Sequence, residues 1–231
     1  MRKYFFFLLL MGVFVNSLLF SEPTSVTEPT SVKKQQLNSI VKRLINPKKT
    51  LSSKDWKKLE EGDVLVKKYF YDTPDGKKAG MAKGIAMFNI KPDALWNTIN
   101  DYEGYKDFMP TVVGTKIIKR FSPVKIRLWH KIKIMWVKLE YVCDLTQVKF
   151  PDGSRLLQWS LVKEKGIKND LKDTIGFWEV IPVDGGNKTI LTYTAFADTG
   201  WSVPKFVQNM LANSQLPNVL RGVYKEAKKR K

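Results

Sequence analysis

The chain has 231 residues, of which 43% are hydrophobic, so it is long enough for one domain with a sizeable core and too apolar for wholesale disorder. Its formal net charge of +18 should attract anionic partners: acidic lipid headgroups, nucleic acid or anionic polysaccharide. The single cysteine, Cys143, excludes an internal disulfide, and together with the single histidine, His130, it excludes a zinc site built from such ligands.

The N-terminus resembles a secretory signal peptide over residues 1–21. Arg2 and Lys3 precede an apolar run of the usual length, residues 4–15. The alternative is a retained membrane anchor, for which the 17 residues from 4 to 20 are a borderline length. We favour cleavage, because polar residues interrupt the apolar run after residue 15. The cleaved protein would lose two positive charges, keep a net charge of +16, and be exported, most simply to the periplasm.

Residues 22–50 are predicted to form a linker and a short amphipathic helix. The near repeat of EPTSV at 22–32 is typical of a flexible linker. The helix, which Pro47 should end, has basic residues on one face and could pack on the domain or lie on an anionic membrane. We favour packing, because the helix is short. Its apolar residues follow helical spacing and are Leu37, Ile40, Val41, Leu44 and Ile45.

Residues 51–231 are predicted to form one domain. A helix over 51–62, with Ser53 as its N-cap, precedes two strands joined by a hairpin turn at 74–76. A second helix begins at Pro92, a residue favoured in the first turn. Alternation of apolar and polar residues then predicts six strands, at 112–120, 124–136, 137–148, 155–164, 174–182 and 188–198.

The alternation in these strands predicts a sheet with one dry face and one wet face. The only amphipathic element large enough to cover the dry face is a C-terminal helix over 201–231, which Pro217 should kink or interrupt. The expected fold class is therefore α+β, a helix-grip architecture in which a curved antiparallel sheet wraps around one long C-terminal helix.

Three regions of the chain stand out beside this order of elements. They are IKPDALWNTINDYEGYKDFMPTVV at 90–113, the hairpin GFWEVIP at 176–182 with KTILTY at 188–193, and WSVPKFVQNML at 201–211. With the order of elements, these segments resemble the helix-grip fold of the START-like (SRPBCC) superfamily, which includes polyketide cyclases and coenzyme Q-binding proteins. The resemblance covers residues 51–228. It implies a deep apolar cavity between sheet and helix that holds a lipid, isoprenoid, sterol or polyketide; most members bind or carry, and some catalyse cyclisation or dehydration.

The predicted wall of this cavity consists of side chains on the apolar faces of the strands and of the C-terminal helix. The segment after the second helix is predicted to form a lid over the cavity mouth. The alternative is that all these residues simply pack together as a core. The lid residues are Tyr105, Phe108, Met109 and Pro110, and the wall residues are Leu139, Tyr141, Cys143, Trp159, Leu161, Trp178, Tyr193, Phe206 and Met210.

We therefore expect an exported, monomeric protein that binds or shuttles a lipid or another hydrophobic small molecule. An anionic membrane surface is its expected second partner, because surface lysine and arginine residues are attracted to acidic headgroups. No metal and no cofactor are expected, since the sequence contains no phosphate-binding loop and no dinucleotide motif. Cys143 faces inward without a visible base and is interpreted as a buried filler.

Two other functions remain open at this point. A cyclase or dehydratase needs a general acid or base inside the cavity, whereas the predicted inner faces offer tyrosine but no carboxylate. His130, between Trp129 and Lys131, is interpreted as a strand or surface histidine. A basic module that binds nucleic acid or the ribosome is permitted by the charge. The signal peptide argues against it, no nucleic-acid motif is present, and no nucleic-acid partner is expected.

Overall fold

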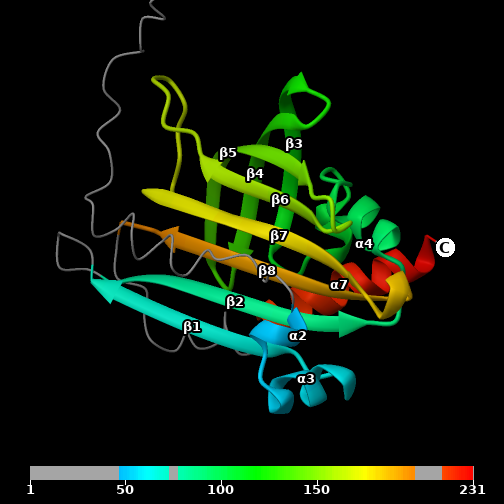
Figure 1. Ribbon diagram of the computed structural model, residues 1–231. Helices are drawn as coiled ribbons and strands as arrows, with labels where there is room; N and C mark the ends of the chain where they lie inside the picture. The colour runs from blue at the N-terminus through cyan, green and yellow to red at the C-terminus, as the bar shows by residue number, and fades with distance from the viewer. Residues whose placement is uncertain (1–46, 73–77, 201–214, 231) are drawn as a thin grey trace, which may run out of the picture. The chain divides into compact units, whose positions relative to one another are not determined.

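The computed structural model of the protein describes residues 47–72, 78–200 and 215–230, all within the unit Val41–Lys231 (Figure 1). The signal peptide, linker and helix predicted for residues 1–46 lie outside the described residues, as do the turn at 74–76 and the helix residues Phe206 and Met210. In the described ranges, no helix is long and apolar enough to span a membrane. The elements are α2 (Pro47–Thr50), α3 (Ser53–Glu60), β1 (Leu65–Asp72), β2 (Lys78–Phe88), α4 (Pro92–Ile99), α5 (Tyr105–Phe108), β3 (Val112–Ser122), β4 (Lys125–Ile134), β5 (Val137–Lys149), β6 (Arg155–Leu161), β7 (Asp173–Val183), η1 (Asp184–Gly186), β8 (Lys188–Asp198) and α7 (Leu216–Lys229).

The eight strands form a single antiparallel sheet in the order β1-β2-β8-β7-β6-β5-β4-β3. Strands that follow one another in sequence are neighbours in the sheet, except that β2 pairs with β8 and so brings the first hairpin beside the last strand (Figure 1). The sheet is curved and does not close, so β1 and β3 are its edges. The α+β helix-grip architecture and the six strands after the second helix are thereby confirmed.

The helix α7 packs closely on β2 because a glycine leaves room for it. A Cβ atom at Gly84 would lie 2.8 Å from Leu220 Cδ1 and 3.0 Å from Leu216 Cγ. One turn further along α7, the Tyr224 ring stacks on Phe88 of β2 with 4.3 Å between ring centroids. Leu220 is fully buried in this contact. The inner face of the sheet is therefore covered along β2 by an apolar stripe of α7.

Two parts of the chain hold α7 on the side away from β2. They are α5 and Asp101, which lies in the loop between α4 and α5. The Arg230 guanidinium forms an ion pair with Asp101 at 2.6 Å and lies 5.8 Å from the centre of the Phe108 ring. In the middle of α7, Gly222 faces the backbone carbonyl of Phe108 so closely that a Cβ atom would clash with the carbonyl oxygen. These contacts, with those to β2, fix the position of α7 over the sheet.

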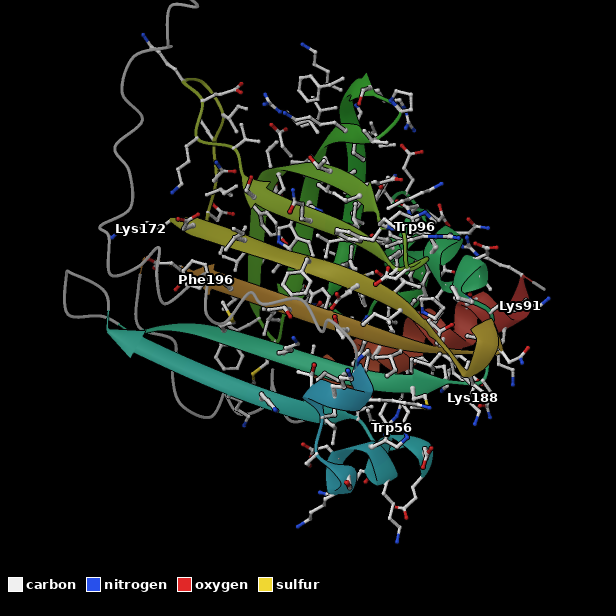
Figure 2. The ribbon with its side chains drawn as sticks, in the orientation of Figure 1. Trp56, Lys91, Trp96, Lys172, Lys188 and Phe196 are labelled. Carbon is white, nitrogen blue, oxygen red and sulfur yellow. The ribbon has the colours of Figure 1, made fainter. Side chains whose placement is uncertain are left out.

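The outer face of the sheet is not uniformly wet, which corrects the sequence prediction. A second apolar cluster lies on the outer side of β2, β7 and β8, where Leu51, between α2 and α3, and Leu59 of α3 cover strand residues. Trp56 of α3 packs against this cluster (Figure 2). The strand residues that it buries are Ile85, Met87, Ile181 and Ile190.

Two charged residues of this outer face are also buried. Glu179 alternates with Trp178 and so lies on the face predicted to be wet, yet it is 0% exposed, and Lys83 of β2 is 7% exposed. Burial lowers the pKa of Lys83, and the negative charge of Glu179 opposes that shift. The Thr192 hydroxyl donates a hydrogen bond to Glu179 at 3.4 Å. Alternation identified the face on which these residues lie, but it carries no information about what covers that face.

Some local boundaries differ from the predictions. The N-cap of α3 is Ser52, whose hydroxyl accepts a hydrogen bond from the Asp55 amide at 3.1 Å, and Ser53 is the first helical residue. Pro217 lies in the first turn of α7, where its missing N–H has no partner in any case, and the predicted helix residues 201–214 lie outside the described residues. The strand predicted to run to residue 136 ends at Ile134, and Met135–Trp136 forms a turn that contains none of the usual turn residues.

We expect Gly222→Ala to lower the free energy of unfolding by about 1–3 kcal/mol, because the new methyl group would meet a backbone atom that cannot turn aside. In an unobstructed helix the same change stabilises by about 0.5–1 kcal/mol, so its sign is diagnostic. Urea denaturation measures it. Lys225→Ala, on the exposed side of α7, is the control and should stay within about 0.5 kcal/mol of wild type. A stabilised Gly222→Ala protein would contradict the close contact between α5 and α7.

Candidate functional site

A cavity of about 400 Å³ lies between the inner face of the sheet and the first turns of α7. Its volume is typical of small-molecule sites, and its wall is mostly apolar. Leu216 and Val219 of α7 contribute to it, as do Ala82 and Ala195, which are cross-strand neighbours in β2 and β8. These two alanines present only methyl groups. On this face of β2, Ala82 therefore leaves space for the cavity, and Gly84, two residues further on, allows α7 to approach the sheet.

Seven of the predicted site residues lie in the wall of this cavity. They come from α5, from the residue that follows it, and from four strands whose alternate residues face the same side. Two more, Phe206 and Met210, lie outside the described residues. The seven are Tyr105, Met109, Leu139, Tyr141, Trp159, Trp178 and Tyr193.

The other four predicted residues lie elsewhere. Phe108 packs edge-on against the Tyr105 ring, 5.7 Å away, and its other neighbour is the Arg230 guanidinium, so it belongs to the contact with α7. Pro110 is exposed. Cys143 and Leu161 face inward but pack in the core beside the cavity, and burial raises the pKa of the Cys143 thiol well above its usual range. That thiol is therefore a poor nucleophile, as a filler would be.

Three aromatic rings form one side of the wall. The Tyr193 ring lies 5.5 Å from Trp159 and 4.4 Å from Trp178, measured between centroids. Gly176 of β7 makes this arrangement possible, because a side chain there would clash with the Trp159 indole. Burial raises the pKa of Tyr193 to about 12, so its hydroxyl stays protonated and can donate a hydrogen bond.

His130 also lines the cavity, which corrects its interpretation as a surface or ordinary strand residue. Its ring stacks on that of Tyr141, its cross-strand partner in β5, at 5.3 Å and an interplanar angle of 18°. Its Nδ1 atom is buried and has no hydrogen-bond partner among the described residues. The sequence did hold a signal, since Leu128, His130 and Ile132 alternate with outward residues in register with the inner face of β5.

The histidine and tyrosine side chains in the cavity wall are uncharged near neutral pH. Burial lowers the pKa of His130 to about 4, so the imidazole is uncharged near pH 7 and offers one donor and one acceptor. Burial also raises the pKa of Tyr141, which keeps its proton. The Tyr105 hydroxyl is already committed, because it donates a hydrogen bond to the Ile99 carbonyl. No carboxylate belongs to the cavity wall among the described residues, and Lys68 on the edge strand β1 is its one cation there.

The sequence matches one known protein family. The family described as polyketide cyclase / dehydrase and lipid transport matches residues 88–223, which is more than half of the sequence. The chain belongs to this family. The matched segment runs from the end of β2 to the middle of α7 and includes most of the cavity wall, except the residues that β1 and β2 contribute. No curated protein sequence matches the chain.

Solved structures of START-like proteins share the fold at low sequence identity. A STAR-related lipid transfer protein from Xanthomonas axonopodis is 16% identical, with a TM-score of 0.59 over 72% of this chain and 98% of that one. Human StAR-related lipid transfer protein 5 is 11% identical, with a TM-score of 0.61 over 86% and 98% of the two chains. The Zhui aromatase/cyclase from a Streptomyces species is 13% identical, with a TM-score of 0.51 over 73% and 96%. The fold is thus shared by proteins named for lipid transfer and by one named as an aromatase/cyclase.

We expect His130 to make the stability of this START-like protein depend on pH. Its pKa is about 4 when folded, against about 6.5 in an unfolded chain, so the unfolded state binds more protons between these values. Stability should therefore fall as the pH drops from about 6.5 to 4, by roughly 3 kcal/mol in full. Denaturant unfolding of wild type and His130→Phe isolates this contribution from that of the carboxylates, because the variant lacks it.

The single histidine also allows a direct measurement, since the chain gives only one set of imidazole resonances in an NMR titration. A titration midpoint near pH 4 is expected. A midpoint near 6.5 would mean that the ring is solvated and that the cavity is wet around it.

Proposed function

We propose that this protein is an exported carrier that binds or shuttles a lipid or another hydrophobic small molecule in the cavity between sheet and α7. The observation that carries the proposal is the cavity itself, which is apolar, about 400 Å³ in volume, and walled by aromatic rings. Water in such a space gains few hydrogen bonds, so an apolar molecule that displaces it is favoured. Membership of a family described by lipid transport supports the same class of function.

The polar atoms of the cavity indicate the chemistry of the ligand. A neutral His130 ring and the Tyr141 hydroxyl together supply donors and an acceptor in otherwise apolar surroundings. A buried polar atom without a partner costs about 1–3 kcal/mol, which a ligand oxygen would recover. The expected ligand is therefore a largely apolar molecule with one hydroxyl or carbonyl group that reaches His130.

Export rests on the first 21 residues, which have the composition of a signal peptide. The measurement is the intact mass of the protein isolated from the cell envelope, which should correspond to cleavage near Ser21. A full-length mass would favour the retained membrane anchor, and recovery only from the cytosol would contradict export.

The cavity is tested by filling it. Ala195→Leu places a larger side chain in the cavity wall and should weaken binding of a fluorescent fatty-acid probe by at least about tenfold, as steric overlap in a closed site costs 1–3 kcal/mol or more. Ser160→Leu adds the same side chain on the exposed outer side of β6 and serves as the control, with wild-type probe binding expected. Equal probe binding by both variants, or none by wild type, would contradict the proposal. Native mass spectrometry of protein from its own cells would then identify the natural ligand.

A cyclase or dehydratase is the second candidate, and His130 is the observation that favours it. A neutral imidazole within a cavity can act as a general base or acid. Molecules that co-purify with wild type and with His130→Phe distinguish the two functions by mass spectrometry. A carrier yields the same compound from both proteins, whereas an enzyme yields unconverted substrate from the variant alone.

A further inference from the structure

The turn between β4 and β5 exposes large apolar side chains at the rim of the cavity. Ile134 and Val137 pair across the hairpin and leave Met135 and Trp136 as a two-residue turn. Trp136 is 71% exposed and Met135 is 42% exposed. All four residues also belong to the cavity wall, so the cavity reaches the surface at this turn.

The backbone of this turn is unfavourable for the residues that it carries. Met135 has φ of +56°, in the left-handed region that favours glycine, and a side chain there costs about 1–2 kcal/mol. Two-residue hairpin turns are usually built from Asn-Gly or Gly-containing pairs. Trp136 gains little from folding in compensation, since it is 71% exposed, and Met135 leaves 42% of its surface exposed. Their apolar surface is therefore available to something outside the chain.

The charges beside the turn are unfavourable as well. Lys133 and Lys138 are exposed cross-strand neighbours, and like charges in that position repel. Glu140, the nearest acid along the hairpin, is paired with Lys131 at 2.6 Å. Within the described part of the chain, neither Lys133 nor Lys138 forms an ion pair. An anionic partner would relieve this repulsion.

The hairpin between β3 and β4 provides a contrast. Phe121 is 41% exposed there, but the cations of Lys119, Lys125 and Arg127 lie 5.0–5.4 Å from its ring centre. Its apolar face is therefore covered by the chain's own charges, as that of Trp136 is not. Phe121 also lies outside the cavity wall.

We propose that the turn Met135–Trp136, with Lys133 and Lys138, is the element that docks the cavity mouth on an anionic lipid bilayer. Trp136 enters the headgroup region, where tryptophan side chains are enriched, and the two lysines contact lipid phosphates on either side. This deepens the proposed carrier function, on which it rests for its purpose, because a lipid would pass between bilayer and cavity without crossing water.

The lysines are tested with the full chain and vesicles of phosphatidylcholine, with or without phosphatidylglycerol, in a flotation assay at low ionic strength. The double variant K133Q/K138Q should bind anionic vesicles roughly 25-fold more weakly, at about fivefold per lysine. The matched control K54Q/K58Q removes two exposed lysines from α3 and the same net charge, and should bind nearly as wild type. Equal losses in both double variants would mean diffuse electrostatic attraction and would overturn the docking site.

Trp136 is tested by Trp136→Ala, which should weaken binding to anionic vesicles by about tenfold or more, as the removal of a large buried apolar side chain does. Phe121→Ala is the control at the other hairpin and should bind as wild type. The chain has seven tryptophans, so the fluorescence of Trp136 is obtained as the difference between wild type and Trp136→Phe. That difference should be quenched by brominated lipids. Its persistence unquenched on bound vesicles would overturn the insertion of Trp136.

The same proteins separate this inference from the carrier function. K133Q/K138Q changes no residue of the cavity wall, so its binding of the fatty-acid probe in solution should equal that of wild type. Probe binding with vesicle docking that is insensitive to these substitutions would overturn the docking turn alone. Docking that depends on Trp136 and the two lysines, in a protein that binds no probe, would overturn the carrier function and leave the docking site standing.

Discussion

The close contact between α7 and β2 is the interaction on which the rest of the structure depends. At Gly84 the absence of a side chain lets Leu220 reach the sheet, and the stacking of Tyr224 on Phe88 extends the contact. The other end of the helix is held by α5 and Arg230. A helix fixed in this way covers the β2 side of a curved sheet, and only its first turns reach the space beneath the more distant strands. The cavity is a consequence of where the helix is held.

The cavity wall contains a polar residue that lowers the stability of the fold. His130 occupies a position between Leu128 and Ile132 where an apolar residue would bury no unpaired polar atom. Its neutral state follows from that burial, and the stacked Tyr141 keeps the ring in place. An uncharged donor and acceptor in apolar surroundings suit a ligand with one polar group, and they also supply the acid–base group that a cyclase would need.

The strand β7, which contains the motif GFWEVIP, is buried on both of its faces. Trp178 faces the cavity and Val180 is fully buried beside it. On the opposite side, Ile181 is buried in the outer cluster with Leu51 and Leu59, and Glu179 is fully buried as well. A strand covered on both faces reads as a nearly continuous apolar run, here GFWEVIP. The acidic residue within it is tolerated because Thr192 donates a hydrogen bond to it and Lys83 lies within reach of its charge.

Much of the fold could be predicted from the sequence, because local patterns determine local structure. Alternation in β4 to β8 placed Tyr141, Trp159, Trp178 and Tyr193 on one face, and the structure brings all four into one wall. The same reasoning missed His130. Alternation with Leu128 and Ile132 places it on the inner face, but a histidine can be either buried or exposed, so its residue type did not indicate burial. It also extended β4 through Met135 and Trp136, since an apolar pair without glycine, asparagine or proline gives no turn signal.

The order of strands and helices along the chain, and the side of each strand on which an apolar residue lies, could be predicted because they follow from periods of two and of about four residues. Family membership rests on sequence motifs within residues 88–223. Periodicity does not tell which apolar residues fill space and which surround it. Phe108 and Cys143 lie in the core, Trp159 and Tyr193 line the cavity, and Glu179 is buried on the face expected to be wet. These outcomes depend on where α7 and the N-terminal helices come to rest, and that position is set by contacts between residues far apart in sequence.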